Sequence, residues 1–137
     1  MGEKYYEFVD LDKDECFHGL GKTLGGVLRN ESLRFDNEIG RGELVRKSLN
    51  EGLSIRKWNF SVFQNLTMRK LAPAPGDERK FVLLYILKPA VFLLKNVKKK
   101  IRISGYRNNM FLTNDIMMDF NVNPKQPFYA FDISFTA

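Results

Sequence analysis

One arginine and several aromatic side chains form the set of residues best suited to hold a small molecule. They are Arg56, Trp58, Tyr85, Phe111 and Tyr129, and each lies in a short apolar run of the chain. Ligand pockets usually combine apolar walls with a few polar groups, and this set contains both kinds of side chain. Simple core packing is the commoner role of such residues, so a ligand site and a plain core both remain open at this level.

A basic segment, KNVKKKIRISGYRNN over residues 95–109, contains six lysines and arginines and no acid. Its charge makes a nucleic-acid contact through Lys98, Lys99, Lys100 and Arg102 an alternative function. A strand with lysines at a hairpin tip has the same composition, and such lysines at a sheet edge discourage aggregation. We favour the edge-strand interpretation, because no aromatic RNA-binding consensus accompanies the charge.

Metal and cofactor chemistry have little support in the sequence. The chain contains one histidine, His18, and one cysteine, Cys16, whereas a zinc site needs three or four ligands. The stretch GLGKT over residues 19–23 lacks the first glycine of a phosphate-binding loop, since Cys16 stands at that position. We therefore expect no metal and no cofactor.

Catalytic residues are equally hard to assign. Cys16 and His18 lie two positions apart in an expected helix and so point to different faces. Three carboxylates in strand-like runs, Asp115, Asp119 and Asp132, are candidates for acid–base work, but solvation or cross-strand pairs with Lys or Arg explain them better. We assign no catalytic residue and expect that the chain is not an enzyme.

The elements that must position these side chains are mostly strands. Ten short runs rich in β-branched and aromatic residues follow residue 30 at hairpin-like spacing, which favours a sandwich, jelly roll or barrel. In residues 128–135, Tyr129, Phe131, Ile133 and Phe135 alternate with small and polar residues, so we expect the aromatic face to be buried. Residues 81–87 are apolar on both faces and predict a central strand covered on both sides.

Length and composition indicate one domain. The 137 residues suffice for a single modest core, and no apolar run approaches the length of a membrane span. The start is acidic and has no signal-peptide pattern, so we expect a cytoplasmic protein without a membrane partner. We expect residues 1–30 to form an N-terminal arm with a short helix, and residues 31–137 to form the β-barrel.

Several stretches together resemble a known family. RFDNEIGRGEL (34–44), GLSIRKWNFSV (52–62), LAPAPGDERKFVLLYILKP (71–89), IRISGYRNNMFLTNDI (101–116) and QPFYAFDISFTA (126–137) resemble the N-terminal domain of AraC-type transcriptional regulators. The likeness covers most of the chain in order. Its motifs are signatures of strands and turns, not of catalysis.

The resemblance implies a mainly β, cupin-like double-stranded β-helix, or jelly-roll barrel. It also implies a regulatory role, in which this domain senses a small-molecule effector, forms a homodimer, or does both. In that family DNA is bound by a separate C-terminal helix-turn-helix domain, which this chain lacks, so we expect contact with DNA only through such a missing domain. The alternative is a small-molecule-binding β-barrel that acts alone.

Overall fold

The computed structural model describes residues 4–9, 15–86, 90–94, 99–103, 109–115 and 117–136 of the chain. These residues form one helix, α1 (Glu15–Leu24), and the strands β1 (Lys4–Val9), β2 (Val27–Arg29), β3 (Ser32–Asp36), β4 (Gly40–Asn50), β5 (Leu53–Val62), β6 (Leu66–Leu71), β7 (Lys80–Ile86), β8 (Ala90–Leu94), β9 (Lys99–Ile103), β10 (Asn109–Thr113), β11 (Met118–Val122) and β12 (Phe128–Thr136). The prediction of a mainly β fold with one short N-terminal helix is confirmed.

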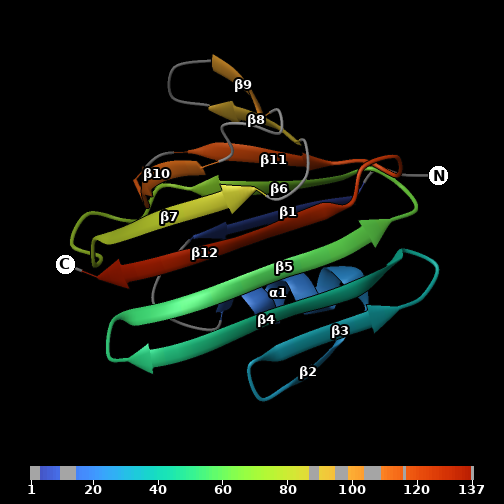
Figure 1. Cartoon of the computed structure of the whole chain (residues 1–137), viewed down its shortest axis with the longest axis horizontal. Coiled ribbons are helices and arrows are strands. Elements are labelled where there is room, and N and C mark those ends of the chain that lie inside the picture. Colours follow the sequence, from blue (N-terminus) through green and yellow to red (C-terminus); the bar gives the residue numbers. More distant parts are fainter. Residues whose placement is uncertain are drawn as a thin grey trace.

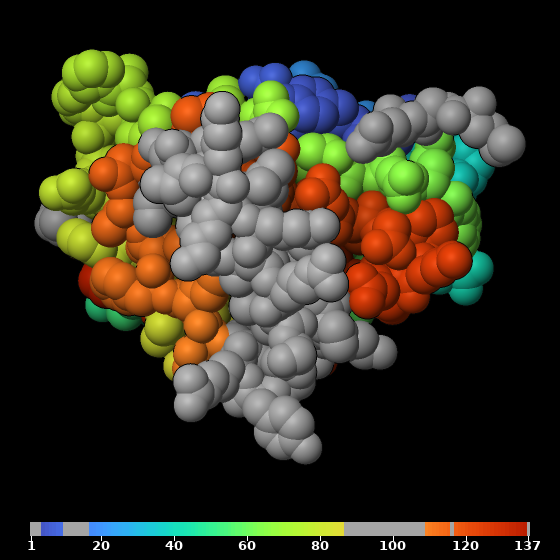
Figure 2. Space-filling model, turned by 90° about the horizontal axis from the view of Figure 1, so that it is seen from above, coloured from blue at the N-terminus to red at the C-terminus, as the bar shows by residue number. Residues whose placement is uncertain are grey.

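The strands form two sheets (Figure 1). The five-stranded sheet has the order β1-β6-β11-β8-β9, and the seven-stranded sheet has the order β10-β7-β12-β5-β4-β3-β2. Pairing is antiparallel throughout except between β1 and β6, which run parallel. Figure 2 shows the blue N-terminal segment bordering the green segment near residue 66, in keeping with this parallel pair. Strands distant in sequence are therefore neighbours in both sheets.

The core lies between the two sheets because one face of each sheet is apolar. The five-stranded sheet contributes Met68 and Phe120, and the seven-stranded sheet contributes Phe60, Leu84 and other buried residues. The rings of Phe120 and Phe128 meet edge to face across the gap, with centroids 6.2 Å apart. Such contacts between the inner faces of facing sheets are those of a β-sandwich or jelly roll.

Helix α1 packs against the core beside β1, β2 and β3 (Figure 1). Its apolar side chains Phe17, Leu20 and Leu24 are buried, and the Phe17 ring meets the Trp58 ring edge to face at 5.4 Å. The stretch GLGKT lies within this helix and not in a phosphate-binding loop. Gly19 is packed so closely against Tyr6 of β1 that a Cβ atom at residue 19 would meet the tyrosine ring.

The N-terminal segment contributes more than an arm and a helix. Residues 4–9 form β1 of the five-stranded sheet, and residues 27–29 form β2 of the seven-stranded sheet. Both strands belong to the stretch 1–30 that the sequence assigns to the arm. The N-terminal stretch therefore supplies an edge strand to each sheet.

Strand β7 lies between β10 and β12, as predicted for a central strand. Its inward side chains Val82, Leu84 and Ile86 are buried, whereas the outward Phe81 and Tyr85 are only half-buried. Among the residues that the structure describes, no second layer packs on this outer face (Figure 1). The expectation that β7 is covered on both sides is therefore not met by the described part of the chain.

Residues 99–103 of the basic segment form β9, at the end of the five-stranded sheet. Lys99, Lys100 and Arg102 belong to β9, which pairs only with β8 among the described strands. The structure describes the backbone of β9, and Lys98 lies outside the described residues. An edge position for this strand agrees with the interpretation favoured from the sequence. No described helix is long and apolar enough to cross a membrane.

Candidate functional site

A small cavity lies inside the fold, between the two sheets. Its volume is about 40 Å³, which is room for a few water molecules. Its walls are mostly apolar, with a polar group on one side; the lining residues are Phe8, Arg56, Trp58, Met68, Lys70, Val82, Leu84, Leu112, Phe120, Phe128 and Asp132.

The polar side of the cavity is built on an ion pair between adjacent strands. Arg56 of β5 and Asp132 of β12 are directly paired in the antiparallel ladder, and both side chains point inward. The Arg56 Nε atom lies 3.0 Å and 3.1 Å from the two carboxylate oxygens of Asp132. The two side chains are 7% and 2% exposed. A charge buried to this degree requires a partner, and each of these residues supplies one to the other.

Trp58 completes this group on the same face of β5. Its indole Nε1 donates a hydrogen bond of 3.0 Å to an oxygen of Asp132. The Arg56 guanidinium carbon lies 5.5 Å from the centre of the Trp58 ring, which is a cation–π distance. Asp132 thus accepts from two residues of β5, Arg56 and Trp58, and holds both side chains in place.

A second cation faces the cavity from the opposite sheet. Lys70 of β6 is 4% exposed, and its Nζ donates to the backbone oxygen of Thr113 at 3.3 Å. The cavity lining therefore carries two cations, Arg56 and Lys70, and a single carboxylate, Asp132. Because charges act strongly in a poorly hydrated interior, two cations in the lining favour an anionic guest.

Polarity changes along the inner face of β5 and β12. At one end the hydroxyls of Ser54 and Ser134 share a buried hydrogen bond of 2.8 Å. Toward the other end the rings of Phe60 and Phe128 pack with centroids 5.6 Å apart. The ion pair lies between these two regions in the strand register. The inner face therefore offers a polar end for a charged group and an apolar end for a hydrocarbon part.

The structure separates the five residues that the sequence selects as a ligand site. Arg56 and Trp58 line the internal cavity. Tyr85, Phe111 and Tyr129 occupy outward positions of β7, β10 and β12, on the other face of the seven-stranded sheet. The sheet therefore lies between the two groups, which do not form one site.

Strand β12 has the reverse orientation to the one expected from its alternation. The buried residues are Ala130, Asp132 and Ser134, while Phe131 and Ile133 are half-buried on the outer face. The expectation that the aromatic face of this strand is the buried one is wrong. The inward face is the polar one because Asp132 pairs with Arg56 and Ser134 with Ser54 of the neighbouring strand.

Sequence reasoning missed Lys70 and assigned no ligand role to Asp132. Lys70 lies in the run LTMRKL, two residues after Met68 and four after Leu66, and so shares the inward face of β6 with them. This spacing was a usable signal, since it places a lysine on the same face as two apolar residues. For Asp132 the signal was its place on one face with Ala130 and Ser134, but a face of such small and polar residues is equally typical of one exposed to solvent.

The other two carboxylates are ion-paired outside this cavity. Asp119 accepts two hydrogen bonds from Arg69, at 2.8 Å and 3.1 Å, and its carboxylate holds the pKa of the Arg69 guanidinium above its ordinary value. Asp115 accepts from the Thr113 hydroxyl, which lowers the pKa of the Asp115 carboxyl, and it also pairs with Arg79. Asp119 and Asp132 make the anticipated cross-strand pairs, and Asp115 is exposed, as the alternative of solvation anticipated.

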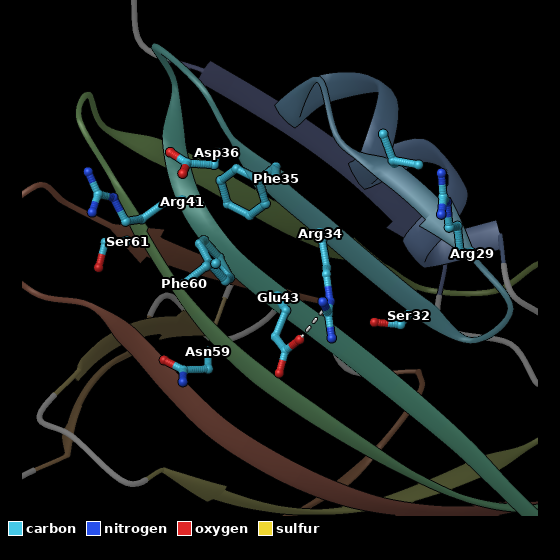
Figure 3. A pocket seen from close by; sticks show the side chains of 12 residues that line it. Arg29, Ser32, Arg34, Phe35, Asp36, Arg41, Glu43, Asn59, Phe60 and Ser61 are labelled. Atoms are coloured by element: carbon cyan, nitrogen blue, oxygen red, sulfur yellow. Dashed lines mark ion pairs between the residues drawn. The ribbon is translucent and has the colours of Figure 1, made fainter.

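A larger hollow lies on the outer face of the seven-stranded sheet, over β2 to β5 (Figure 3). It has a volume of about 1040 Å³ and its lining includes Arg29, Arg34, Arg41, Asp36 and Glu43. Arg34 pairs with Glu43 at 3.1 Å, where the arginine side chain is 78% exposed. An exposed ion pair of this kind contributes little energy. The charged side chains of this hollow lie open to water, where charges act weakly, so the internal cavity is the better candidate site.

His18 and the remaining metal-ligand candidates do not gather. His18 is exposed on α1. Within the described ranges, no three His, Cys, Asp or Glu side chains are placed to hold one metal ion.

Comparison with known proteins finds likenesses in structure alone. No family model matches the chain. No curated protein matches it either. Among solved structures, the EutQ protein of Clostridium difficile is 13% identical with a TM-score of 0.45, over 75% of each chain. An RmlC-like cupin from Desulfovibrio desulfuricans is 9% identical, with a TM-score of 0.45, over 75% of this chain and 87% of that one.

A cupin protein from Bacteroides fragilis is 11% identical with a TM-score of 0.42, over 76% of this chain and 85% of that one. Two of these three proteins are described as cupins. At such identities and TM-scores the likenesses say nothing about a ligand or an activity. The candidate site therefore rests on this chain's own residues.

Proposed function

We propose that this chain is a binding domain that takes a small carboxylic acid into the cavity between its two sheets. The observation that carries the proposal is the composition of the lining, in which Arg56 and Lys70 face a single carboxylate, Asp132. A ligand carboxylate would add an acceptor beside these two cations, and hydrogen bonds from a cation to a carboxylate are among the stronger ones. The role is binding without turnover, and no cofactor takes part.

The size of the cavity restricts the ligand. A volume of about 40 Å³ is far below the several hundred Å³ of a pocket for a drug-sized molecule. The guest is therefore an acid of a few heavy atoms, or a longer one that displaces a side chain such as Phe8. Phe8 lies on β1 and is only half-buried, so it is the lining residue with the most freedom to move.

We further propose that the domain is the sensing half of an AraC-type transcriptional regulator. The resemblance of its strand and turn segments to that family supports this role. A physical link also supports it, because Trp58 contacts Asp132 on one side and Phe17 of α1 on the other. A ligand that draws Arg56 or Asp132 toward itself would shift Trp58, and the shift would reach α1.

Tryptophan fluorescence tests the ligand proposal directly. Trp58 is the one tryptophan of the chain, so an intrinsic fluorescence change on titration reports on the cavity. We expect saturable changes with small carboxylates such as acetate, propionate or benzoate, and none with the matching amides. Binding also raises the melting temperature, because a ligand that binds only the folded state stabilises it.

Matched lysine variants provide the control. Lys70→Met removes the cavity cation and is expected to weaken carboxylate binding at least tenfold, whereas Lys22→Met on the exposed side of α1 leaves binding unchanged. Equal responses to acids and amides, or full binding by Lys70→Met, would refute the acid-binding proposal.

The regulatory role needs a separate test. An antibody raised against this chain would be used to measure the size of the native protein in its own cells. A band at about twice 16.0 kDa leaves room for a helix-turn-helix domain and agrees with the sensing half of a regulator. A band near 16.0 kDa would favour a small binding protein that acts alone and would overturn the regulatory proposal.

A further inference from the structure

The hollow on the outer face of β2 to β5 contains a polar atom that the fold leaves without a hydrogen bond. Its lining includes Ser32, whose Oγ atom is buried and has no hydrogen-bond partner. Among the described residues, no other buried side-chain nitrogen or oxygen lacks a partner. A buried hydroxyl without a partner is destabilising, and in a native fold it indicates a place for a water, an ion or a ligand group.

Three arginines line the same hollow, one from each of three adjacent strands: Arg29 of β2, Arg34 of β3 and Arg41 of β4. The exposed Arg29 side chain forms no ion pair or hydrogen bond with the other described residues. Arg34 pairs with Glu43 through its Nε atom at 3.1 Å. A guanidinium has five N–H donors in a fork, so Arg34 can hold this carboxylate and an anion at the same time.

The β2–β3 hairpin places Ser32 beside two of these arginines. Arg29 and Ser32 are directly paired across the hairpin, on either side of the two-residue turn 30–31. Asn30 has a φ of 54° in this turn, a conformation that asparagine adopts more readily than most residues. Arg34 follows Ser32 by two residues and so shares its face of β3. Figure 3 shows the Ser32 hydroxyl turned toward the side of the hollow where Arg34 lies.

This set of donors suits a terminal phosphate group. Such a group has three acceptor oxygens and a charge of about −1.5 to −2 at neutral pH, which matches one hydroxyl and two guanidinium groups. A carboxylate has only two oxygens for the same three donors. Asp36 and Glu43 also line the hollow, and they would repel the successive phosphates of a nucleic-acid strand. The arrangement therefore fits a ligand with one phosphate group.

The rest of the hollow has room for a polar body attached to the phosphate. Its volume of about 1040 Å³ is that of a pocket for a whole small molecule and far exceeds a phosphate ion. Asn59 and Ser61 of β5 form the wall two strands from Arg34, at a distance of about 10 Å. Neither side chain forms a hydrogen bond with the other described residues. Together with Glu43 they offer donors and acceptors to hydroxyl groups.

We propose that this hollow is a second binding site, which takes a small phosphate monoester with a hydroxyl-bearing body. The phosphate group lies against Ser32, Arg29 and Arg34, and the body extends over β4 toward Asn59. A phosphate oxygen reaches the Ser32 hydroxyl when a neighbouring side chain moves, and Arg34 has room to do so because its side chain is 78% exposed. The site lies on the opposite face of the sheet from the internal cavity and does not depend on the proposed acid.

Calorimetric titration of the whole chain tests this proposal with matched ligands. The probes are adenosine monophosphate against adenosine, a hexose monophosphate against the free hexose, and inorganic phosphate alone. We expect at least one ester to bind in the millimolar range or more tightly, and its unphosphorylated partner to bind about tenfold more weakly. Inorganic phosphate is expected to bind more weakly than that ester because it leaves the wall at Asn59 unused. The tighter ester shows whether the body is a nucleoside or a sugar.

Substitutions in the hollow identify the phosphate anchor. Arg29→Gln and Arg34→Gln are each expected to weaken ester binding about tenfold, and Ser32→Ala about fivefold. Ser32→Ala should also leave the melting temperature unchanged or raise it, since the hydroxyl has no partner to lose. Arg79→Gln is the matched control, because the Arg79 side chain is 63% exposed and does not line the hollow. A circular dichroism spectrum of each variant shows that it is folded.

Three results would overturn the phosphate site. The first is a wild-type chain that binds neither ester at millimolar concentration. The second is equal binding of both esters and their unphosphorylated partners. The third is ester binding by all three hollow variants that is as tight as binding by Arg79→Gln. Inorganic phosphate bound as tightly as both esters would overturn the assignment of a monoester.

Lys70→Met separates this site from the internal cavity. Since Lys70 lines the cavity and not the hollow, this variant is expected to bind the ester as the wild-type chain does. Loss of ester binding in Lys70→Met would place the ester in the cavity and overturn the second site. Failure of acetate to bind the wild-type chain would count against the acid-binding cavity alone.

Discussion

Arg56 and Asp132 are held together inside the protein by adjacent strands. The Nε atom of Arg56 lies 3.0 Å and 3.1 Å from the carboxylate oxygens of Asp132, and both side chains are almost fully buried. Desolvation of two charges offsets much of what their attraction contributes, so such a pair adds little net stability. It does make each partner dependent on the other, and this dependence can be measured.

Replacement of Asp132 is expected to be costly. Asp132→Asn leaves Arg56 buried without a carboxylate, and we expect the free energy of unfolding to fall by about 3–5 kcal/mol. The control Asp36→Asn removes an exposed carboxylate, and we expect it to change the free energy of unfolding by less than about 0.5 kcal/mol. Urea unfolding measures both. In the double variant Arg56→Met, Asp132→Leu, most of the loss should be recovered; a double variant as unstable as Asp132→Asn would contradict the pair's role.

Two glycines with positive φ are expected to respond differently to alanine. At Gly42, with φ of 147°, a Cβ atom would lie 2.5 Å from the Cα of Phe60 and against the backbone oxygen of Asn59. At Gly76, with φ of 94°, no atom lies within 4 Å of such a Cβ. We expect Gly76→Ala to lose about 1 kcal/mol from backbone strain alone and Gly42→Ala clearly more. Thermal unfolding of the two variants checks this order, and equal losses would show that the close approach at Gly42 is unimportant.

The helix is expected to be an integral part of the core. Leu20 of α1 is fully buried, so Leu20→Ala should remove about 2–5 kcal/mol of stability. Leu49 at the end of β4 is 48% exposed, and Leu49→Ala should cost less than about 1 kcal/mol. Chemical denaturation of both variants is the measurement. A small effect of Leu20→Ala would mean that α1 is only loosely attached to the sheets.

The pKa of Asp115 is expected to depend on Thr113. The hydrogen bond from the Thr113 hydroxyl is the main cause that lowers the pKa of Asp115, with smaller help from Arg79. A carboxyl with a lowered pKa in the folded state stabilises the fold at pH values above its unfolded pKa. That contribution is lost as the pH falls through the folded pKa.

Thr113→Val should therefore raise the pKa of Asp115 and reduce the loss of stability on acidification. An NMR titration of the aspartate carboxyl carbons measures the shift. Thr67→Val serves as the control because the Thr67 hydroxyl donates to the side-chain oxygen of Asn121, an amide. An unchanged titration of Asp115 in Thr113→Val would show that the hydroxyl has no such effect.

Local patterns in the sequence were sufficient to locate most of the strands. Runs such as LSIRKWNFSV and NMFLT coincide with β5 and β10, because β-branched and aromatic residues bounded by turn residues have few other conformations available. The loop around Gly76 contains prolines and a glycine, which are turn residues, and Gly76 has a positive φ. Strand β1 was missed, because KYYEFV has no partner nearby in sequence and pairs with β6, about sixty residues later.

The sequence by itself determined that apolar residues alternate with polar or small ones along several strands, and that the chain forms a mainly β domain with a short helix. Alternation defines two faces of a strand but does not say which face points inward, because that depends on what the neighbouring strands present. In β12 the face that carries Asp132 points inward, because Arg56 and Trp58 of β5 donate hydrogen bonds to Asp132 there. The same orientation of β12 turns Phe131 and Ile133 outward, and it brings Asp132 into the cavity beside Arg56.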